Sequence, residues 1–148
     1  MITLQPLRWW QLPEVLALEQ VLFAPENWSE ELFWSELAQG ENRSYTVVVD
    51  GTELLGYGGL ALGGEQAYVQ TIGIAPDHQH HGLGARLLTD MLAVAVRRGA
   101  GEIGLEVRAS NATAQRLYAR HGFEAVGRRR GYYQPSGEDA LIMVRELS

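Results

Sequence analysis

A glycine-containing segment, residues 79–85, carries the residue types best suited to chemistry in this chain. It follows the apolar residues 69–74 and opens a helix-like apolar pattern over residues 83–98. Gly82 and Gly84 would leave backbone N–H groups accessible at the positive end of a helix dipole, which is a favourable environment for a phosphate. We therefore expect a phosphate or pyrophosphate site here, with an ordinary structural turn as the alternative.

A dinucleotide site is a second interpretation of the same segment. Such a site needs a third glycine, where this chain has Leu87, and a tight turn between a strand and a helix. Glu106 lies near the distance at which such sites place an acidic residue, but residues 76–81 form a long loop. The preceding strands are also expected to be antiparallel, so this interpretation is the weaker one.

Glu106 is a candidate general base. Alternation along the strand-like residues 102–107 places Gly104 and Glu106 on one face. Near the end of a central strand the Glu106 carboxylate would be largely desolvated, and desolvation makes carboxylates in general more basic. The alternative is a strand-end glutamate that lies in water or pairs with Arg108.

Tyr118 is a candidate general acid, because a phenol can protonate a thiolate leaving group. Its spacing places it on one helix face with Leu117 and His121, which by itself favours a core tyrosine. The cluster His78, His80 and His81 lacks the spacing of a metal site, so we expect these side chains to lie beside phosphates instead.

Apolar periodicity and turn signals place these candidates on alternating kinds of element. The pairs Asp50-Gly51 and Gly63-Gly64 favour hairpins, whereas Ser29 and Asn111 are suitable helix caps. The order predicts a mixed α/β (α+β) fold in a single domain over residues 1–148. Strands are expected at residues 2–7, 45–49, 53–62, 66–74, 102–107, 123–130 and 140–146, and helices at 10–23, after 29, at 83–98 and from 111 to about 120.

Composition excludes several classes of protein. The formal charge of -6 argues against a nucleic-acid partner and favours a cationic ligand such as an amine or a protein N-terminus. The chain has no cysteine, which excludes disulfides and cysteine nucleophiles. It lacks an apolar run of the ~20 residues that a membrane helix needs, and its first six residues do not resemble a signal peptide. We expect a cytoplasmic protein without a membrane partner.

Taken together, these motifs resemble the GCN5-related N-acetyltransferase (GNAT) superfamily, and within it the ribosomal-protein-alanine N-acetyltransferases of the RimI type. The superfamily pattern Gln/Arg-x-x-Gly-x-Gly/Ala is similar to residues 79–84. The resemblance runs from about Val69 to the C-terminus, and before that only Trp28-Ser29 is similar to a family element. The narrower signature is carried by residues 105–111, Leu117-Tyr118, Gly122-Phe123, Tyr132-Tyr133 and 138–143.

The resemblance implies a GNAT fold, in which a mostly antiparallel mixed sheet of about seven strands is splayed at the cofactor site and flanked by about four helices. It implies acetyl-CoA as cosubstrate and no metal. The general base would be Glu106, acting through water, and the general acid would be Tyr118. Trp28, Tyr132 and Tyr133 would line the substrate cleft. The implied cofactor-binding residues are Ile72, Gly73, Ile74, Gln79, His80, His81, Gly82, Leu83, Gly84, Ala85 and Asn111.

The implied function is direct acetyl transfer to a protein N-terminal amine. The implied acceptor is the N-terminal alanine of the eighteenth protein of the small ribosomal subunit. Acetylation of lysine or a small-molecule amine, and a non-catalytic CoA-binding module, are the alternatives. The chain departs from the family pattern at His80, at Gly131, in residues 24–27 and in the short loop 134–137. The changes in these last two segments bear on the choice of acceptor more than on the chemistry.

Overall fold

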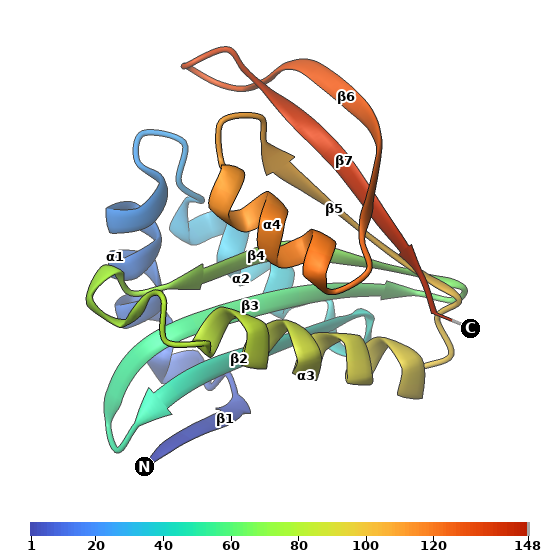
Figure 1. Cartoon of the computed structure of the whole chain (residues 1–148). Helices are drawn as coiled ribbons and strands as arrows, with labels where there is room; N and C mark the ends of the chain where they lie inside the picture. Colours follow the sequence, from blue (N-terminus) through green and yellow to red (C-terminus); the bar gives the residue numbers. More distant parts are fainter. Residues whose placement is uncertain (148) are drawn as a thin grey trace.

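Seven strands form one mixed sheet in the computed structural model, which describes residues 1–147 (Figure 1). Their order across the sheet is β1-β2-β3-β4-β5-β7-β6. Neighbouring strands are antiparallel except for β4 and β5, which are parallel. The sheet agrees with the fold class expected from the sequence. The strands are β1 (Ile2–Pro6), β2 (Arg43–Asp50), β3 (Glu53–Gly63), β4 (Gln66–Ile74), β5 (Glu102–Arg108), β6 (Glu124–Tyr133) and β7 (Glu138–Glu146).

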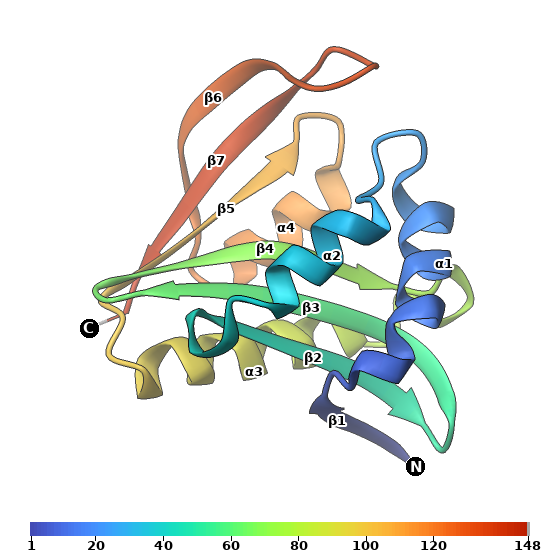
Figure 2. The ribbon, with the colours of Figure 1, turned by 180° about the vertical axis from the view of Figure 1, so that it is seen from behind.

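Helices cover both faces of this sheet. Helices α3 (Leu83–Arg97) and α4 (Ala112–Arg120) lie on the face that Figure 1 shows in front, and α1 (Leu12–Phe23) and α2 (Glu30–Leu37) cover the opposite face (Figure 2). The apolar side chains accordingly form two buried clusters, one under each pair of helices. Within residues 1–147, no helix has the length and apolar character required to cross a membrane.

The predicted helix caps are confirmed. Ser29 Oγ accepts a hydrogen bond from the N–H of Leu32 at 3.1 Å, and Asn111 Oδ1 accepts one from the N–H of Ala114 at 3.0 Å. Each bond satisfies one of the backbone donors that a helix start leaves without a partner.

Several element boundaries differ from the expected ones, among them the start of α1 and the end of β6. The helix expected from Trp10 begins at Leu12, because a 3₁₀ turn, Trp9–Gln11, precedes it. Gln11 Oε1 accepts the N–H of Arg8 at 2.7 Å, and this bond holds the tighter turn. At the other end of the chain, β6 continues three residues beyond 130, to Tyr133.

The sheet opens between its two parallel strands. β4 and β5 are paired only at Gln66↔Glu102, Ala67↔Ile103 and Tyr68↔Gly104. β5 stays paired with β7 as far as Arg108, whereas residues 69–74 of β4 have no strand partner on this edge within the described chain. The fold therefore exposes a free strand edge in the middle of the sheet, with α1 on one side and α4 on the other.

A buried carboxylate holds the strand at this opening in place. Glu36 of α2 accepts hydrogen bonds at Oε1 from Arg43 Nε at 2.8 Å, from the hydroxyl of Tyr45 at 2.7 Å and from Gln70 Nε2 at 3.0 Å. Gln70 occupies the bulge of β4 opposite Gly59 and Leu60. The network thus ties α2 and β2 to the point at which β4 leaves β5.

The ring of Tyr45 reaches Glu36 by lying over Gly59, its partner across β2 and β3. We predict that Gly59→Ala lowers the free energy of unfolding by about 1–3 kcal/mol, because the new methyl group would overlap the Tyr45 ring. Chemical denaturation measures the change. Gly63→Ala in the same strand is the control, because its methyl group would lie 4.0 Å from its nearest neighbour, the carbonyl oxygen of Gln66. Equal stability of the two variants would contradict the packing described.

Candidate functional site

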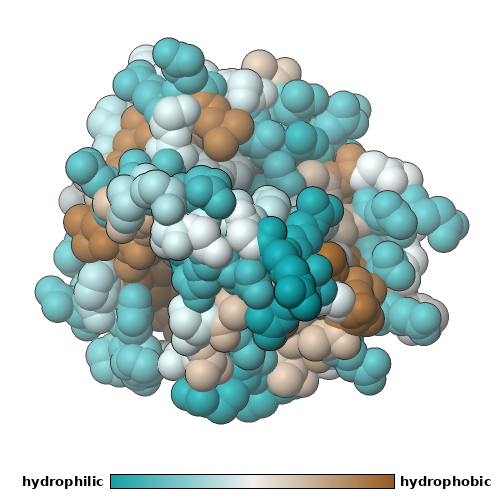
Figure 3. All heavy atoms as spheres, turned by 90° about the horizontal axis from the view of Figure 1, so that it is seen from above, coloured by the Kyte–Doolittle hydropathy of each residue, from teal (hydrophilic) through white to brown (hydrophobic). Residues whose placement is uncertain are grey.

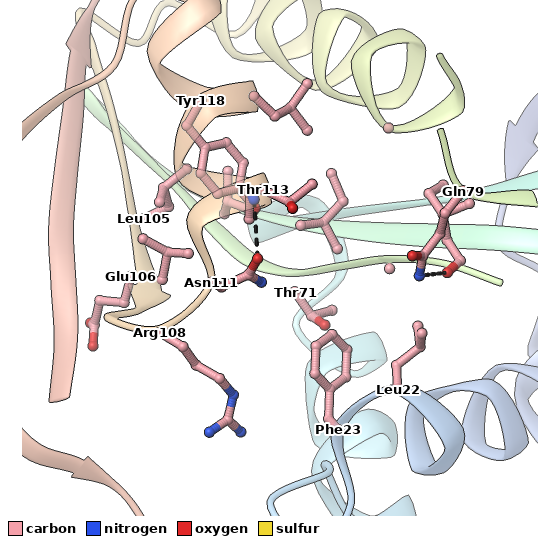
Figure 4. Close-up of a pocket in the computed structure, with 18 of the residues that line it drawn as sticks. Leu22, Phe23, Thr71, Gln79, Leu105, Glu106, Arg108, Asn111, Thr113 and Tyr118 are labelled. Atoms are coloured by element: carbon pink, nitrogen blue, oxygen red, sulfur yellow. Dashed lines mark hydrogen bonds between the residues drawn. The ribbon is translucent and has the colours of Figure 1, made fainter. Parts of the chain in front are cut away.

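A cavity of about 560 Å³ lies where β4 and β5 separate. Its walls come from α1, β4, the start of α3, β5 and α4, and Figure 4 shows side chains from these walls, among them Phe23, Thr71 and Tyr118. The cavity therefore joins elements that are far apart in the sequence around the open edge of β4.

One end of the cavity is formed by the start of α3. Gly82 caps this helix with φ +81°, and the N–H of Arg86 makes the first intrahelical bond, to the carbonyl oxygen of Gly82. The N–H groups before Arg86 have no intrahelical acceptor, and no side chain in the described chain caps this helix. Gly84 permits close approach of α4, since a methyl group there would lie 3.4 Å from Cδ2 of Leu117. These bare donors at a positive dipole end suit an anion such as a pyrophosphate.

The middle of the cavity is the free edge of β4. Its backbone N–H and C=O groups can pair with an extended ligand that carries amide groups, as another strand would. Gly73 lets the side chains of α1 and β3 pack closely against this strand. A methyl group at this position would overlap Leu22 and lie 3.2 Å from the hydroxyl of Tyr57.

Most of the residues expected at a cofactor site lie together around this cavity, but two of them do not. The Leu83 side chain is buried in the core under α3, and His81 lies outside the cavity lining. Gln79 donates from Nε2 to the carbonyl oxygen of Ile74 at 3.0 Å, so its side chain fixes the loop to the end of β4. The residues that line the cavity are Ile72, Gly73, Ile74, Gln79, His80, Gly82, Gly84, Ala85 and Asn111.

Glu106 lies in the same cavity, and its side chain is 11% exposed. Its Oε1 accepts a hydrogen bond from the hydroxyl of Tyr68 and lies 3.7 Å from Nε of Arg129. Its Oε2 is buried and has no hydrogen-bond partner in residues 1–147. The alternative of pairing with Arg108 is wrong, because Arg108 contacts other carboxylates. One oxygen of Glu106 is thus anchored, and the other has no hydrogen-bond partner among the described residues.

Tyr118 is both a core residue and a cavity residue. It is 6% exposed, and its ring packs edge-on against Phe123 with the ring centres 5.8 Å apart. Burial raises the pKa of Tyr118 well above its usual value near 10. Its hydroxyl therefore stays protonated near neutral pH and is available as a proton donor there.

Arg108 joins two segments over the acceptor side of the cavity. Its guanidinium pairs with Glu26 between α1 and α2 and with Glu138 at the start of β7, 3.3 Å away. Glu26 Oε2 also accepts the N–H and the hydroxyl of Ser136, at 2.9 and 2.6 Å. The two segments that depart from the family pattern, residues 24–27 and 134–137, are therefore bound to each other.

Two of the three aromatic residues expected to bind the substrate line the cavity, and the third does not. Trp28 and Tyr133 line the cavity, Trp28 against Phe33 with ring centres 5.0 Å apart. Arg108 lies 4.1 Å over the Tyr133 ring, and burial raises the pKa of Tyr133 to about 12. Tyr132 is 46% exposed and lies outside the lining. Seen from above, the surface is mostly hydrophilic, and hydrophobic residues form separate patches on it (Figure 3).

Glu19 is a site residue that sequence reasoning missed. It is 2% exposed and accepts hydrogen bonds from the hydroxyl of Tyr57 at 2.5 Å and from the N–H of Trp28 at 2.9 Å. Burial raises the pKa of Glu19 above its ordinary value. Its helical spacing from Leu12 and Val15, which places it on the apolar face of α1, is the signal that could have identified it.

Comparison with known proteins gives consistent findings. The family model described as "Acetyltransferase (GNAT) family" matches residues 6–123. An N-alpha-acetyltransferase RimI of Mycobacterium tuberculosis is 41% identical over 134 residues, which are 87% of this chain and 82% of that protein. The crystal structure of the ribosomal-protein-S18-alanine N-acetyltransferase from Escherichia coli has a TM-score of 0.90 and 34% identity, and the match covers 100% of this chain and 95% of that chain.

A solved structure of Arabidopsis thaliana NAA60 in complex with acetyl-CoA has a TM-score of 0.87. The match covers 99% of both chains, and at 20% identity it shows a common fold alone.

The contacts of Glu26 give a prediction about its titration. The hydrogen bond from the Ser136 hydroxyl, and then Arg108, lower the pKa of Glu26, whereas Ser110 and Arg108 lower that of Glu138. Both carboxylates should therefore titrate below the ordinary glutamate value near 4.3, so their contacts persist above it and are lost as the pH falls through the lowered values. Carboxyl NMR titration checks this. Ser136→Ala should raise the midpoint of Glu26 more than that of Glu138, and an unchanged Glu26 midpoint would contradict the contact.

Proposed function

The chain belongs to the acetyltransferase (GNAT) family and is an N-acetyltransferase of the RimI type. We propose that it acetylates the N-terminal alanine of ribosomal protein S18 of the small subunit, with acetyl-CoA as the donor. The observation that carries this proposal is that one cavity contains bare helix N–H groups, a free strand edge and a carboxylate with one unpartnered oxygen.

The cavity suits each part of acetyl-CoA. The start of α3, with Gly82 and Gly84, binds the pyrophosphate through backbone N–H groups. The amides of the pantetheine arm pair with residues 69–74 of β4, which the opening of the sheet leaves free. This arrangement directs the thioester along β4 towards Glu106, and a backbone N–H of β4 stabilises the oxyanion that forms on its carbonyl.

Glu106 takes the proton of the attacking amine, directly or through one water. An α-amino group has a pKa near 7.7–8.0, so a moderate base is sufficient to free its lone pair. The nitrogen then attacks the thioester carbonyl and forms the amide while the bond to sulfur breaks. The unpartnered Oε2 supports this role, because it is the oxygen of Glu106 that can still accept a proton.

Tyr118 protonates the departing CoA thiolate. Because burial raises its pKa, the phenol is protonated when the thiolate begins to form, and it donates to the sulfur as the bond breaks. Starting from the ammonium form, the nitrogen loses two protons in each turnover. Glu106 takes the first, which frees the lone pair, and passes it to solvent, and the second leaves to water after the attack. Tyr118 gives one proton to sulfur and is reprotonated from solvent.

The acceptor enters where residues 24–27 meet residues 134–137. The wall on this side is formed by Trp28, Tyr133 and the contacts of Arg108. It limits the space for the first residues of a peptide. A narrow entrance lined with carboxylates suits a flexible, cationic N-terminus better than a side chain on the surface of a folded protein.

We predict that mass spectrometry of a ribosomal protein mixture, after incubation with the protein and acetyl-CoA, finds acetyl on the first residue of a single small-subunit protein. A lysine peptide and a polyamine, assayed in parallel, should be acetylated far more slowly. Acetyl on internal lysines or on the small amine, with unmodified protein N-termini, would contradict the proposed acceptor.

We predict that Glu106→Gln and Tyr118→Phe each lower kcat by about 10²–10⁴-fold and leave the melting temperature unchanged, because each removes a group that moves a proton. Steady-state kinetics with a peptide that begins with alanine measures the effect. Glu102→Gln, at the start of the same strand as Glu106, is the matched control and should have the kcat of the unchanged protein. Unchanged kcat in both variants would refute the role assignment.

A further inference from the structure

Tyr68 occupies a special position in the sheet. It forms the last pair between β4 and β5, with Gly104, before the two strands separate. Its ring lies beside Gly104, since a methyl group at Gly104 would be 3.6 Å from Cδ2 and 3.8 Å from Cε2 of Tyr68. The Tyr68 ring thus runs along β5 at position 104.

The path of the ring leads to Glu106. Side chains alternate along a strand, so Gly104 and Glu106 project from the same face of β5, two residues apart. A tyrosine that passes over position 104 extends its hydroxyl to position 106, where it donates to Oε1. The contact thus follows from the register of the parallel pair.

The surroundings of Glu106 show what this bond does. Tyr68 of β4 donates to Oε1, and the guanidinium of Arg129 of β6 lies 3.7 Å from the same oxygen. This guanidinium also lies over the ring of Tyr132. Neither Tyr68 nor Arg129 engages Oε2, which is buried and unpartnered in the described chain. The carboxylate is therefore held by Oε1, and Oε2 has no partner among the described residues.

We propose that Tyr68 is a positioning residue of the acetyl transfer, and that its hydroxyl fixes Oε1 of Glu106 so that Oε2 is aimed at the amine of the acceptor. This proposal rests on the proposed function, in which Glu106 is the general base. Tyr68 itself takes no proton: burial and the bond to Glu106 raise its pKa, so its hydroxyl stays protonated and remains a donor.

A purely structural role for Tyr68 is the competing explanation, because its ring also packs over Gly104 where the sheet opens. Tyr68→Phe separates the two roles, since it keeps the ring and removes only the donor. Tyr45→Phe is the matched control: it removes a tyrosine hydroxyl that donates to a different buried carboxylate, Glu36.

The experiment is a double-mutant cycle. Tyr68→Phe is made in the unchanged protein and in Glu106→Gln, and single-turnover acetylation of a synthetic peptide that begins with alanine is followed by mass spectrometry at saturating acetyl-CoA. In the unchanged protein we expect Tyr68→Phe to lower the single-turnover rate about tenfold, with the melting temperature unaltered and with the same KM for acetyl-CoA in a separate steady-state titration. In the Glu106→Gln protein we expect no further loss, because the group that Tyr68 orients is already gone. Tyr45→Phe should leave the rate unchanged.

Each other outcome is informative. A rate unaffected by Tyr68→Phe, beside a slow Glu106→Gln protein, overturns the positioning role and leaves the general base in place. Equal losses from Tyr68→Phe in both backgrounds overturn it in favour of packing. A Glu106→Gln protein as fast as the unchanged one, or no acetylation of the peptide at all, removes the proposed function and this inference with it.

Discussion

The separation of β4 from β5 after three residue pairs is the constraint on which the rest of the site depends. A sheet normally satisfies the backbone groups of an internal strand on both edges, whereas here residues 69–74 are paired with β3 alone. The opening creates the cavity, supplies unpaired backbone groups along one wall, and places the start of α3 at one end and Glu106 at the other.

The surrounding elements keep this opening from closing. β5 stays paired with β7 through Arg108, and β4 is held by β3 and by the bond from Gln70 to Glu36. Tyr45 and Tyr68 play similar parts, since each ring lies over a glycine of the paired strand and its hydroxyl reaches a carboxylate. Only at Gly59 would a methyl group overlap the ring. The same packing device therefore stabilises the sheet in one place and orients a site residue in another.

Local features of the molecule could be predicted from the sequence. The limits of β4, the hairpins and the caps at Ser29 and Asn111 depend on neighbouring residues, and they agree with the structure. The insertion of β7 between β5 and β6 could not be predicted, because strand order depends on contacts between distant segments. The site also has a part that could be predicted and a part that could not. Residues 79–85 form a local motif and could be recognised from the sequence. The contact of Tyr68 with Glu106 depends on the register of two strands, and the contact of Arg108 with Glu26 joins distant segments, so neither could be predicted.

Hydrogen exchange of backbone amides, with and without CoA, tests most directly whether the open strand edge and the start of α3 hold the cosubstrate. We expect CoA to slow exchange in residues 69–74 and in residues 82–85, while the strands at the other edge of the sheet, β1 and β2, keep their rates. Protection confined to other parts of the chain, with both of these segments exchanging as fast as in the free protein, would contradict this expectation.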